Sequence, residues 1–301
     1  MKCLQVIGTD PRRDGASPRL ALLEDGGAVQ VLRTPHQGIT TALDVLAALG
    51  DRALQAESWR RSAAEAGALE ATSWGRLETG DGAWRLTLPI TPPEVWVAGV
   101  TYQRSADFRE EGTGIYDQVY AAERPELFFK ATAARCAGPG QAIGRRRDST
   151  FTACEPELAV VLGRDGLVLG FTLANDVSAW DIERENPLYL PQSKVYRGCF
   201  AFGPVVVTPD EIADPYALTL AARVERAGRV VFAGSASTAQ LKRRLPELVG
   251  WLLRSNDVPR GTVLSTGTGI IQPMDVGLEE GDLVTIDCPE IGALSNPVAW
   301  V

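Results

Sequence analysis

Histidine is nearly absent from this sequence, since His36 is the single one in 301 residues. A histidine-based catalytic triad or a histidine-rich metal site would have to be built around that residue. Segment 34–38 is predicted to be a peripheral loop, so we assign His36 a structural or surface role. Cysteine is also scarce, with five residues far apart and no C-x-x-C pair. This spacing is typical of reduced cytosolic thiols and argues against a disulfide framework or a zinc site.

Long runs of one kind of residue are missing as well. The longest basic block is Arg145–Arg147 and the formal net charge is −8, so nucleic acid is not an expected partner. Residues 1–8 contain no long apolar segment like that of a signal peptide, and no stretch approaches the length of a membrane span. Apolar (45%) and charged (23%) residues occur in proportions ordinary for a soluble globular protein. We predict a cytoplasmic protein with no membrane partner.

Two regions of different texture follow one another along the chain. Residues 1–90 are predicted to form a small α+β domain, with strands at 4–7 and 28–32, a turn at 25–27 and helices at 41–50 and 57–66. The turn Thr91–Pro93 marks a boundary. Residues 93–301 are predicted to form one β-rich domain with a single convincing helix at 246–254, and the fold class is α+β. Its expected strands are 95–100, 127–129, 158–162, 167–173, 204–207, 217–220, 229–232 and 283–286.

Three carboxylates stand at the ends of apolar runs. Glu155 and Glu157 stand at the head of one apolar run, and Asp176 follows another. If the first run is a strand, the two glutamates, two positions apart, lie on the same face. Like charges held this close repel, and one carboxylate is driven toward its protonated form unless a cation lies between them. Oxygen ligands select a hard ion, Mg²⁺, Mn²⁺ or Ca²⁺, over Zn²⁺. The pattern indicates a catalytic metal site with open positions; the alternative is a solvated strand face.

Other polar residues in this region each have two interpretations. Lys194 adds an ammonium group to the site or is a surface lysine. Thr266–Gly269 is a glycine-rich turn with open backbone N–H groups or an ordinary loop. Cys154 precedes Glu155, and because that carboxylate would raise the pKa of the thiol, we favour a packing residue over a nucleophile.

The order of these pieces resembles the fumarylacetoacetate hydrolase superfamily over residues 93–301. Within it, segments 123–130 and 185–192 look most like the 2-keto-3-deoxy-arabinonate dehydratase branch. The matching pieces are Gly99–Asp107, Pro125–Lys130, Glu155–Val161, Gly170–Ser178, Lys194, Phe202–Pro204, Thr266–Gly269, Gly281–Asp282 and Gly292–Val298.

The resemblance implies a fold and a set of roles. The fold is a mixed β-roll, a sheet folded on itself with few helices, preceded by a small N-terminal domain. Lys194 matches the lysine beside the metal-bound substrate, and Thr268, with Gly267 in the same segment, matches the loop that holds a substrate carboxylate. The family typically forms homodimers or homotetramers. Its metal ligands, for which Mg²⁺ is usual, match Glu155, Glu157 and Asp176.

One departure from the family bears on the reaction. Hydrolases of this family carry a histidine in the loop after the first strand, where alignment on Tyr102 places Ser105 at or near the matching position. Serine has no proton affinity near pH 7 and cannot replace imidazole as a general base, which disfavours C–C hydrolysis by the usual route. Dehydration needs no activated water, which agrees with the dehydratase-like segments.

We therefore predict a hydro-lyase that acts on a small-molecule 2-keto acid. It would dehydrate a 2-keto-3-deoxy sugar acid, arabinonate-like, to a 2-oxo semialdehyde through a metal-stabilised enolate. The alternatives on the same metal are acylpyruvate-type C–C hydrolysis and 2-keto-acid decarboxylation. A non-enzymatic binding or scaffolding protein is the third possibility, and the intact carboxylate trio counts against it.

This hypothesis assigns further residues. Lys194 would stabilise the enolate or carry a proton, and Glu126 would act as acid/base unless it only pairs with Arg124. A second departure from the family is Trp180, near which close relatives usually carry arginine. The loss of that cation predicts a shift toward a less acidic or more apolar substrate. The expected substrate contacts are Tyr102, Arg104 and Ser105.

Overall fold

The computed structural model describes residues 2–10, 17–32, 41–44, 69–102 and 115–301. The predicted helix over 57–66, most of the one over 41–50 and the loop that carries His36 lie outside these ranges. Arg104 and Ser105 also lie outside the described residues, so their predicted contacts stay predictions.

Within the described ranges, the larger sheet has twelve strands and contains both parallel and antiparallel pairs. Two short strands lie off its main path, β5 (Trp84–Leu86) beside β1 and β8 (Cys136–Ala137) beside β14. The strands follow the spatial order β4 (Leu69–Ser73), β3 (Ala28–Leu32), β2 (Arg19–Leu23), β1 (Lys2–Gly8), β14 (Phe200–Val207), β12 (Val168–Asp176), β11 (Pro156–Leu162), β17 (Val263–Thr268), β6 (Val95–Gly99) and β7 (Glu126–Ala131).

The continuous apolar run of β11 reflects burial on both faces of the sheet. Leu158 and Val160 belong to one hydrophobic core, whereas Ala159 and Val161 belong to another. Because successive side chains of a strand point to opposite faces, a strand between two cores needs apolar residues at every position. The predicted strand over 158–162 is therefore confirmed, and its pattern shows that it lies in the centre of the molecule.

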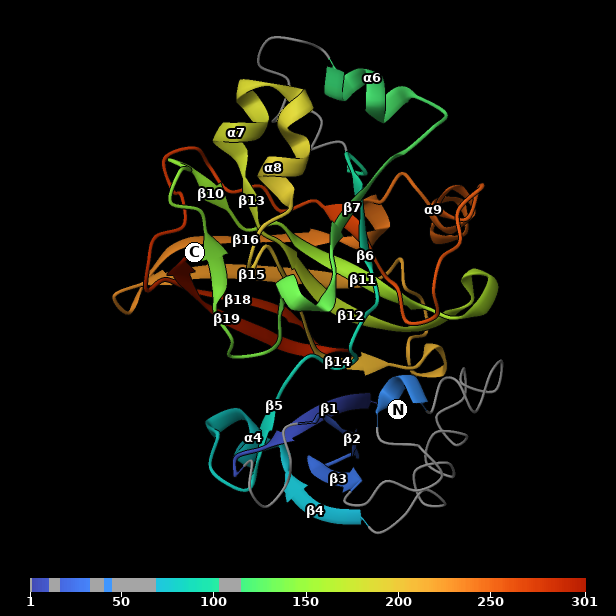
Figure 1. Cartoon of the computed structure of the whole chain (residues 1–301), viewed down its shortest axis with the longest axis vertical. Helices are drawn as coiled ribbons and strands as arrows, with labels where there is room; N and C mark the ends of the chain where they lie inside the picture. Colours follow the sequence, from blue (N-terminus) through green and yellow to red (C-terminus); the bar gives the residue numbers. More distant parts are fainter. Residues whose placement is uncertain (1, 11–16, 33–40, 45–68, 103–114) are drawn as a thin grey trace.

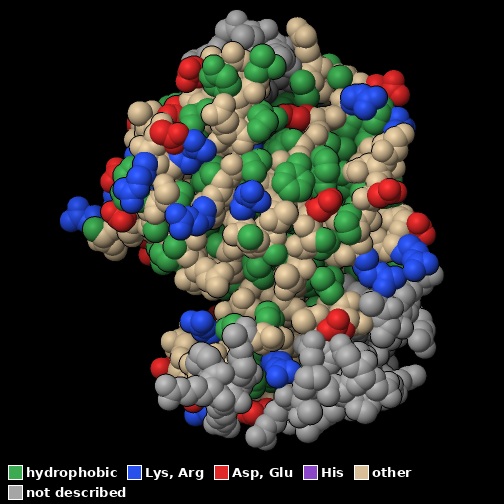
Figure 2. All heavy atoms as spheres, viewed as in Figure 1, with side chains coloured by type: hydrophobic (Ala, Val, Ile, Leu, Met, Phe, Trp, Pro, Cys, Tyr) green, Lys and Arg blue, Asp and Glu red, His purple; other side chains and the backbone are tan. Residues whose placement is uncertain are grey.

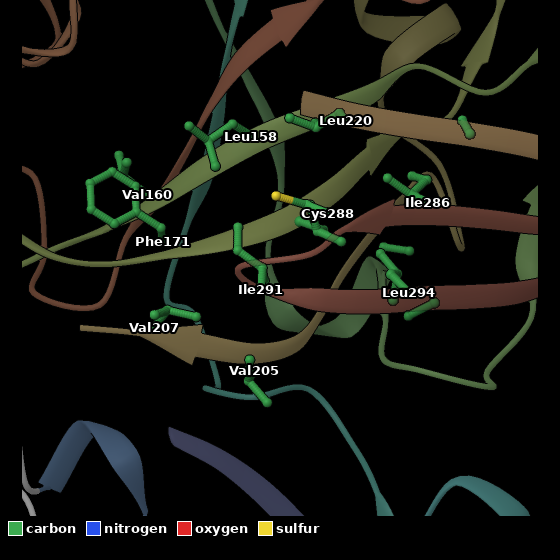
Figure 3. Close-up of a cluster of buried hydrophobic side chains, with 14 of the residues drawn as sticks. Leu158, Val160, Phe171, Val205, Val207, Leu220, Ile286, Cys288, Ile291 and Leu294 are labelled. Carbon is green, nitrogen blue, oxygen red and sulfur yellow. The ribbon is translucent and has the colours of Figure 1, made fainter. Parts of the chain in front are cut away.

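A second sheet packs against one face of the first. Side chains from β11, β12 and β14 meet those of the second sheet in one hydrophobic core (Figure 3). Leu158 and Phe171 lie on the first side of this core, and Leu220, Ile286 and Leu294 lie on the other. The second sheet has the order β16 (Arg229–Ser237), β15 (Thr219–Arg226), β18 (Leu283–Cys288), β19 (Gly292–Trp300) and β9 (Ile143–Arg145).

The helices of the described residues are short. The helix predicted over 246–254 is confirmed as α9 (Leu245–Leu252). The sequence pattern missed α6 (Ile115–Ala121), α7 (Trp180–Glu185) and α8 (Leu190–Lys194), which lie together at one end of the sheets (Figure 1). Segments of five to seven residues complete at most two helical turns, too few for an apolar stripe to be recognised. A further short helix, α4 (Trp74–Thr79), lies beside the N-terminal strands.

The N-terminal strands continue the large sheet. β1 pairs with β14 through Lys2 opposite Val207 and Cys3 opposite Val206. The predicted strand over 28–32 is confirmed as β3, and β2 had not been predicted. Among the described residues, no helix combines the length and apolarity needed to cross a membrane. On the face shown in Figure 2, the described basic side chains are interspersed with acidic ones.

Candidate functional site

The candidate site lies where five neighbouring strands reach the same end of the large sheet. In spatial order these are β12, β11, β17, β6 and β7. Pairing across them joins Glu157 to Thr268 and Gly99 to Glu126. Strands β12 and β11 are antiparallel, so Asp176 ends β12 at the same end of the sheet where Glu157 lies near the start of β11. Residues far apart in the sequence are thereby brought to one end of one rigid element.

Three carboxylates converge at this end of the sheet. One oxygen of each of Glu155, Glu157 and Asp176 lies within 4.8 Å of the others, and all three side chains are buried. Backbone pairing fixes their spacing, because the Asp176 N–H donates to the Glu155 carbonyl at 3.0 Å. The Asn175 side-chain oxygen in turn accepts the Glu155 N–H at 3.0 Å. The grouping predicted from spacing alone is present, and a solvated strand face is excluded by the burial.

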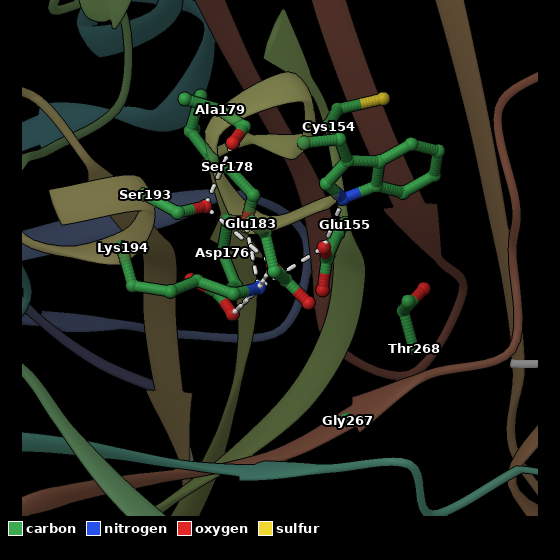
Figure 4. Close-up of polar contacts among 12 residues, drawn as sticks. Cys154, Glu155, Asp176, Ser178, Ala179, Glu183, Ser193, Lys194, Gly267 and Thr268 are labelled. Carbon is green, nitrogen blue, oxygen red and sulfur yellow. Dashed lines mark hydrogen bonds and ion pairs between the residues drawn. The ribbon is translucent and has the colours of Figure 1, made fainter. Parts of the chain in front are cut away.

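Two buried lysines offset the charge of this carboxylate group. Lys194 Nζ donates to Glu155 Oε1 at 3.0 Å, to Asp176 Oδ2 at 2.9 Å and to Ser178 Oγ at 2.7 Å (Figure 4). Lys130 Nζ lies 2.5 Å from Asp176 Oδ1 and donates to the Val177 carbonyl at 2.8 Å. Both side chains are at most 2% exposed. Lys194 is therefore not a surface lysine, and its ammonium group bridges two of the three carboxylates.

Among the three clustered carboxylates, Glu157 is the one whose negative charge has no lysine in contact with it within the described residues. Burial and the negative charges of Asp176 and Glu155 raise its pKa well above the usual range, against the hydrogen bonds that lower it. Its Oε2 accepts from Ser265 Oγ at 2.5 Å and from the Gly267 N–H at 2.8 Å. Within the described part of the chain, its buried Oε1 has no hydrogen-bond partner. A buried, unpartnered carboxylate oxygen beside two further carboxylates fits a hard divalent cation, the ligand set that Mg²⁺ prefers.

The glycine-rich segment differs from its prediction. Thr266–Thr268 belongs to β17 rather than to a turn, and the Gly267 N–H is occupied by Glu157. Gly267 has a φ of +91°, and a Cβ there would lie 2.1 Å from Thr101 Oγ1, so only glycine fits. Thr268 exchanges hydrogen bonds with the backbone of Ile270 through its hydroxyl. The segment therefore helps to fix the position of the Glu157 carboxylate.

A small pocket opens beside these groups and includes Glu126. In the described chain it is lined by Val97, Gly99, Val100, Glu126, Phe128, Glu155, Asp176, Lys194, Gly267 and Thr268. Arg124, the alternative partner considered for Glu126, has its guanidinium 4.5 Å from the centre of the Trp251 ring. Glu126 thus shares one cavity with Lys194 and two of the clustered carboxylates.

Tyr102 and Cys154 lie next to the same group. Tyr102 is 4% exposed, and burial together with the charge of Glu157 raises its pKa. Its ring lies so close to Gly269 that a Cβ there would be 2.6 Å from the ring. Cys154 is fully buried and burial raises its pKa to about 12, so it packs rather than acting as a nucleophile.

Gly99 makes room for the carboxylate of Glu126, and this predicts a substitution with a selective effect. A Cβ at Gly99 would lie 2.1 Å from Glu126 Oε2, the far end of a flexible side chain. Gly99→Ala should leave the melting temperature nearly unchanged because the carboxylate can swing away, while kcat falls about 100-fold because Glu126 leaves its position. Gly250→Ala, where a Cβ meets open space, is the control that should leave kcat unchanged, and its melting temperature should equal or slightly exceed that of the wild type because alanine favours the helix α9. An unchanged kcat in Gly99→Ala would show that the position of Glu126 does not matter.

A family model called Fumarylacetoacetate (FAA) hydrolase C-terminal matches residues 94–299. The chain belongs to this family. The 2-dehydro-3-deoxy-D-arabinonate dehydratase of Saccharolobus solfataricus is 51% identical over 71% of this chain and 74% of that protein. A probable 2-keto-3-deoxyxylonate dehydratase of Haloferax volcanii is 47% identical over 71% of this chain and 75% of that protein. The structure of a 2-keto-3-deoxy-D-arabinonate dehydratase complexed with magnesium and 2,5-dioxopentanoate matches with a TM-score of 0.83 at 39% identity, covering 100% of this chain and 99% of that one.

Membership of the fumarylacetoacetate hydrolase family, predicted from the motifs, is thereby confirmed, as is a fold of mixed sheets with few helices. Three contacts of the site were not foreseen. Lys130 was quoted as part of a motif without a role, although a lysine inside an apolar strand signals a buried ion pair. The contact of Trp180 with Glu155 and the buried Glu183, 4.0 Å from Lys194, depend on helix α7, which had no sequence signal.

Proposed function

We propose that this chain is a Mg²⁺-dependent hydro-lyase that dehydrates a 2-keto-3-deoxy sugar acid, arabinonate-like, to a 2-oxo semialdehyde. The observation that carries the proposal is the convergence of three buried carboxylates and Lys194 beside a pocket that also contains Glu126. The dehydratases of Saccharolobus solfataricus and Haloferax volcanii, which resemble this chain most strongly among the proteins named above, support the same reaction class.

Glu155, Glu157 and Asp176 would hold the cation, since they supply only oxygen ligands. When bound, a divalent cation supplies a Lewis acid that stabilises negative charge on a 2-keto acid. Mn²⁺ and Ca²⁺ are the other hard ions that such a ligand group accepts. Magnesium is favoured because it is present in the solved dehydratase at 39% identity.

The chain's own side chains would carry the proton transfers. Glu126 takes the proton from the carbon next to the ketone, and the electron pair of that C–H bond forms an enolate whose negative oxygen is stabilised by the Lys194 ammonium. Glu126 then gives this proton to the hydroxyl on the following carbon, which leaves as water and yields an α,β-unsaturated ketone. A proton shift from the hydroxyl-bearing terminal carbon to the carbon next to the ketone forms an enol at that end, which tautomerises to the aldehyde. Glu126 and Lys194 face the same pocket, which supports these paired roles.

Substrate binding would use the remaining walls of the pocket. We propose that Thr268 contacts the substrate carboxylate, that Gly267, whose N–H is taken by Glu157, only lines the pocket, and that Tyr102 closes the same side. Arg104 and Ser105 follow Tyr102 in the sequence and are proposed as further contacts. For the architecture we propose a mixed β-roll from residue 93 to 301, a small N-terminal α+β domain over 1–90 whose strands extend the large sheet, and a homodimer or homotetramer.

The test is incubation of the protein with 2-keto-3-deoxy-arabinonate in the presence of Mg²⁺. We expect the substrate to be consumed and an aldehyde to accumulate, as followed by proton NMR, and we expect chelation by EDTA to stop the reaction. Formation of pyruvate or carbon dioxide would instead support the hydrolase or decarboxylase alternative. Failure to act on a panel of 2-keto acids, together with no effect of Mg²⁺ on the melting temperature, would contradict the proposal.

A further inference from the structure

Trp180 contacts the carboxylate group without lining the pocket. Its indole Nε1 donates to Glu155 Oε1 at 2.6 Å, and the side chains of both residues are buried, each 3% exposed. The same oxygen accepts from Lys194 Nζ at 3.0 Å, so two donors converge on Glu155 Oε1. The substitution of arginine by Trp180 had suggested an altered substrate preference. Its hydrogen bond shows instead that Trp180 acts on Glu155, one of the three clustered carboxylates.

The indole ring is held by its own small hydrophobic cluster. Trp180, Ala153 and Ile271 pack together as buried residues, and Phe151 packs against them. The Phe151 and Trp180 rings stack with centroids 5.8 Å apart and an interplanar angle of 26°. Ala153 lies two residues before Glu155, on the strand β10 (Thr152–Ala153). Both ends of this hydrogen bond are therefore anchored to the same rigid part of the fold.

The two donors to Glu155 differ in charge and rigidity. Lys194 carries a positive charge on a long flexible stem and divides its hydrogen bonds among Glu155, Asp176 and Ser178. An ammonium so close to the carboxylates repels a second cation. The indole N–H is neutral and belongs to a stacked, rigid ring, so it can orient a carboxylate without opposing the charge of a divalent cation.

We propose that Trp180 is a positioning residue, which holds the Glu155 carboxylate toward Glu157 and Asp176 and so sets the affinity for Mg²⁺. The inference rests on the proposed function only in treating Glu155 as a ligand of the cation. A hydrogen-bond donor to a ligating carboxylate changes metal affinity by about 10- to 100-fold when removed. The effect would fall on the occupancy of the site rather than on the chemistry once the site is filled.

The experiment measures Mg²⁺ binding by isothermal titration calorimetry with MgCl₂ and no substrate. Trp180→Phe keeps an aromatic ring against Phe151 and removes the N–H, and we expect its Kd for Mg²⁺ to rise about 10- to 100-fold. At saturating Mg²⁺ its kcat should stay near the wild-type value, whereas the Mg²⁺ concentration that gives half-maximal rate should rise in parallel with Kd. A Kd equal to that of the wild type would overturn the proposal.

Two further variants separate orientation from packing. Phe151→Leu removes the stacking partner, but Ala153 and Ile271 still pack against the indole and its N–H is kept, so its Kd should rise far less than that of Trp180→Phe. Trp180→His restores a ring N–H and, measured at pH 8 where imidazole is neutral, should recover part of the affinity lost in Trp180→Phe. Equal weakening in Phe151→Leu and Trp180→Phe, or no recovery in Trp180→His, would assign Trp180 a packing role only.

The same measurements keep this inference distinct from the proposed function. A wild-type protein that binds Mg²⁺ and dehydrates the substrate, beside a Trp180→Phe variant of equal affinity, defeats the inference alone. A wild-type protein that binds no Mg²⁺ defeats both. Should Trp180→Phe fail to fold, as judged by circular dichroism, the comparison of Trp180→His with Phe151→Leu decides the question.

Discussion

Glu157→Gln is expected to abolish Mg²⁺-dependent dehydration while leaving the metal-free protein folded. The amide can still accept hydrogen bonds from Ser265 and from the Gly267 N–H, so the local structure should persist. The variant loses one anionic ligand of three, and we expect kcat to fall by at least about 1,000-fold and the Mg²⁺-induced rise in melting temperature to vanish. The measurements are initial rates of aldehyde formation and thermal unfolding with and without MgCl₂.

The sign of the pH effect follows from the raised pKa of Glu157. Below the pKa of an unfolded glutamate, about 4.3, the carboxyl is protonated in both states and costs nothing. As the pH rises toward the elevated folded pKa, the unfolded state ionises more readily, so the metal-free protein loses stability. Glutamine does not ionise, and Glu157→Gln should lack this loss and be at least as stable as the wild type at neutral pH without Mg²⁺.

The control for this series is an exposed carboxylate. Glu280 is exposed and lies in a turn, so Glu280→Gln should keep the wild-type rate, Mg²⁺ response and pH dependence of stability. A fully active Glu157→Gln protein would overturn the assignment of the metal ligands.

Lys130→Met is expected to cause the largest loss of stability among single substitutions at the site. Lys130 is fully buried, and its ammonium lies 2.5 Å from Asp176 Oδ1 and donates to the Val177 carbonyl. Methionine retains most of the apolar stem of lysine but removes the positive charge that lies beside the Asp176 carboxylate. Removing one partner of a buried pair costs about 3–5 kcal/mol, and we expect the lower end because Lys194 still contacts Asp176. Urea unfolding without added metal measures the difference.

A double-substitution cycle tests whether the loss comes from the ion pair. Asp176→Asn removes the negative charge, so adding Lys130→Met to that background should cost clearly less than it does in the wild type. Equal costs in the two backgrounds would mean that Lys130 stabilises the fold through packing or through its bond to Val177 alone.

The sequence was sufficient to predict the strands that become β11 and β12 and the grouping of the three carboxylates, because both depend on local pattern. The apolar run that becomes β11 is continuous, and Glu155 and Glu157 stand at its head, so alternation alone assigns them to one face. Asp176 could be added because it ends the run that becomes β12, and two antiparallel neighbours bring a start and an end together. The motif order then identified the family.

The remaining contacts depend on pairing between distant segments, which no local pattern encodes. Gly267 is next to Glu157 only because β17 pairs with β11, and Glu126 is next to Gly99 only because β7 pairs with β6. Lys194 reaches the carboxylates from the short helix α8, whose five residues show no recognisable periodicity. For this reason the Gly267 N–H was expected to be open, whereas it is occupied.

Different strands of the sheet carry the two proposed functions of the site, metal binding and proton transfer. The groups proposed to hold the ion come from β11, β12 and the residues beside them, while Glu126 and the space for its carboxylate come from β6 and β7, two strands farther along the sheet. Substitutions in β6 and β7 can replace the proton-transfer group while β11 and β12 keep the carboxylates that would bind the cation. A family built on this plan can acquire new chemistries by altering one margin of a sheet, without redesigning the electrostatics at its centre.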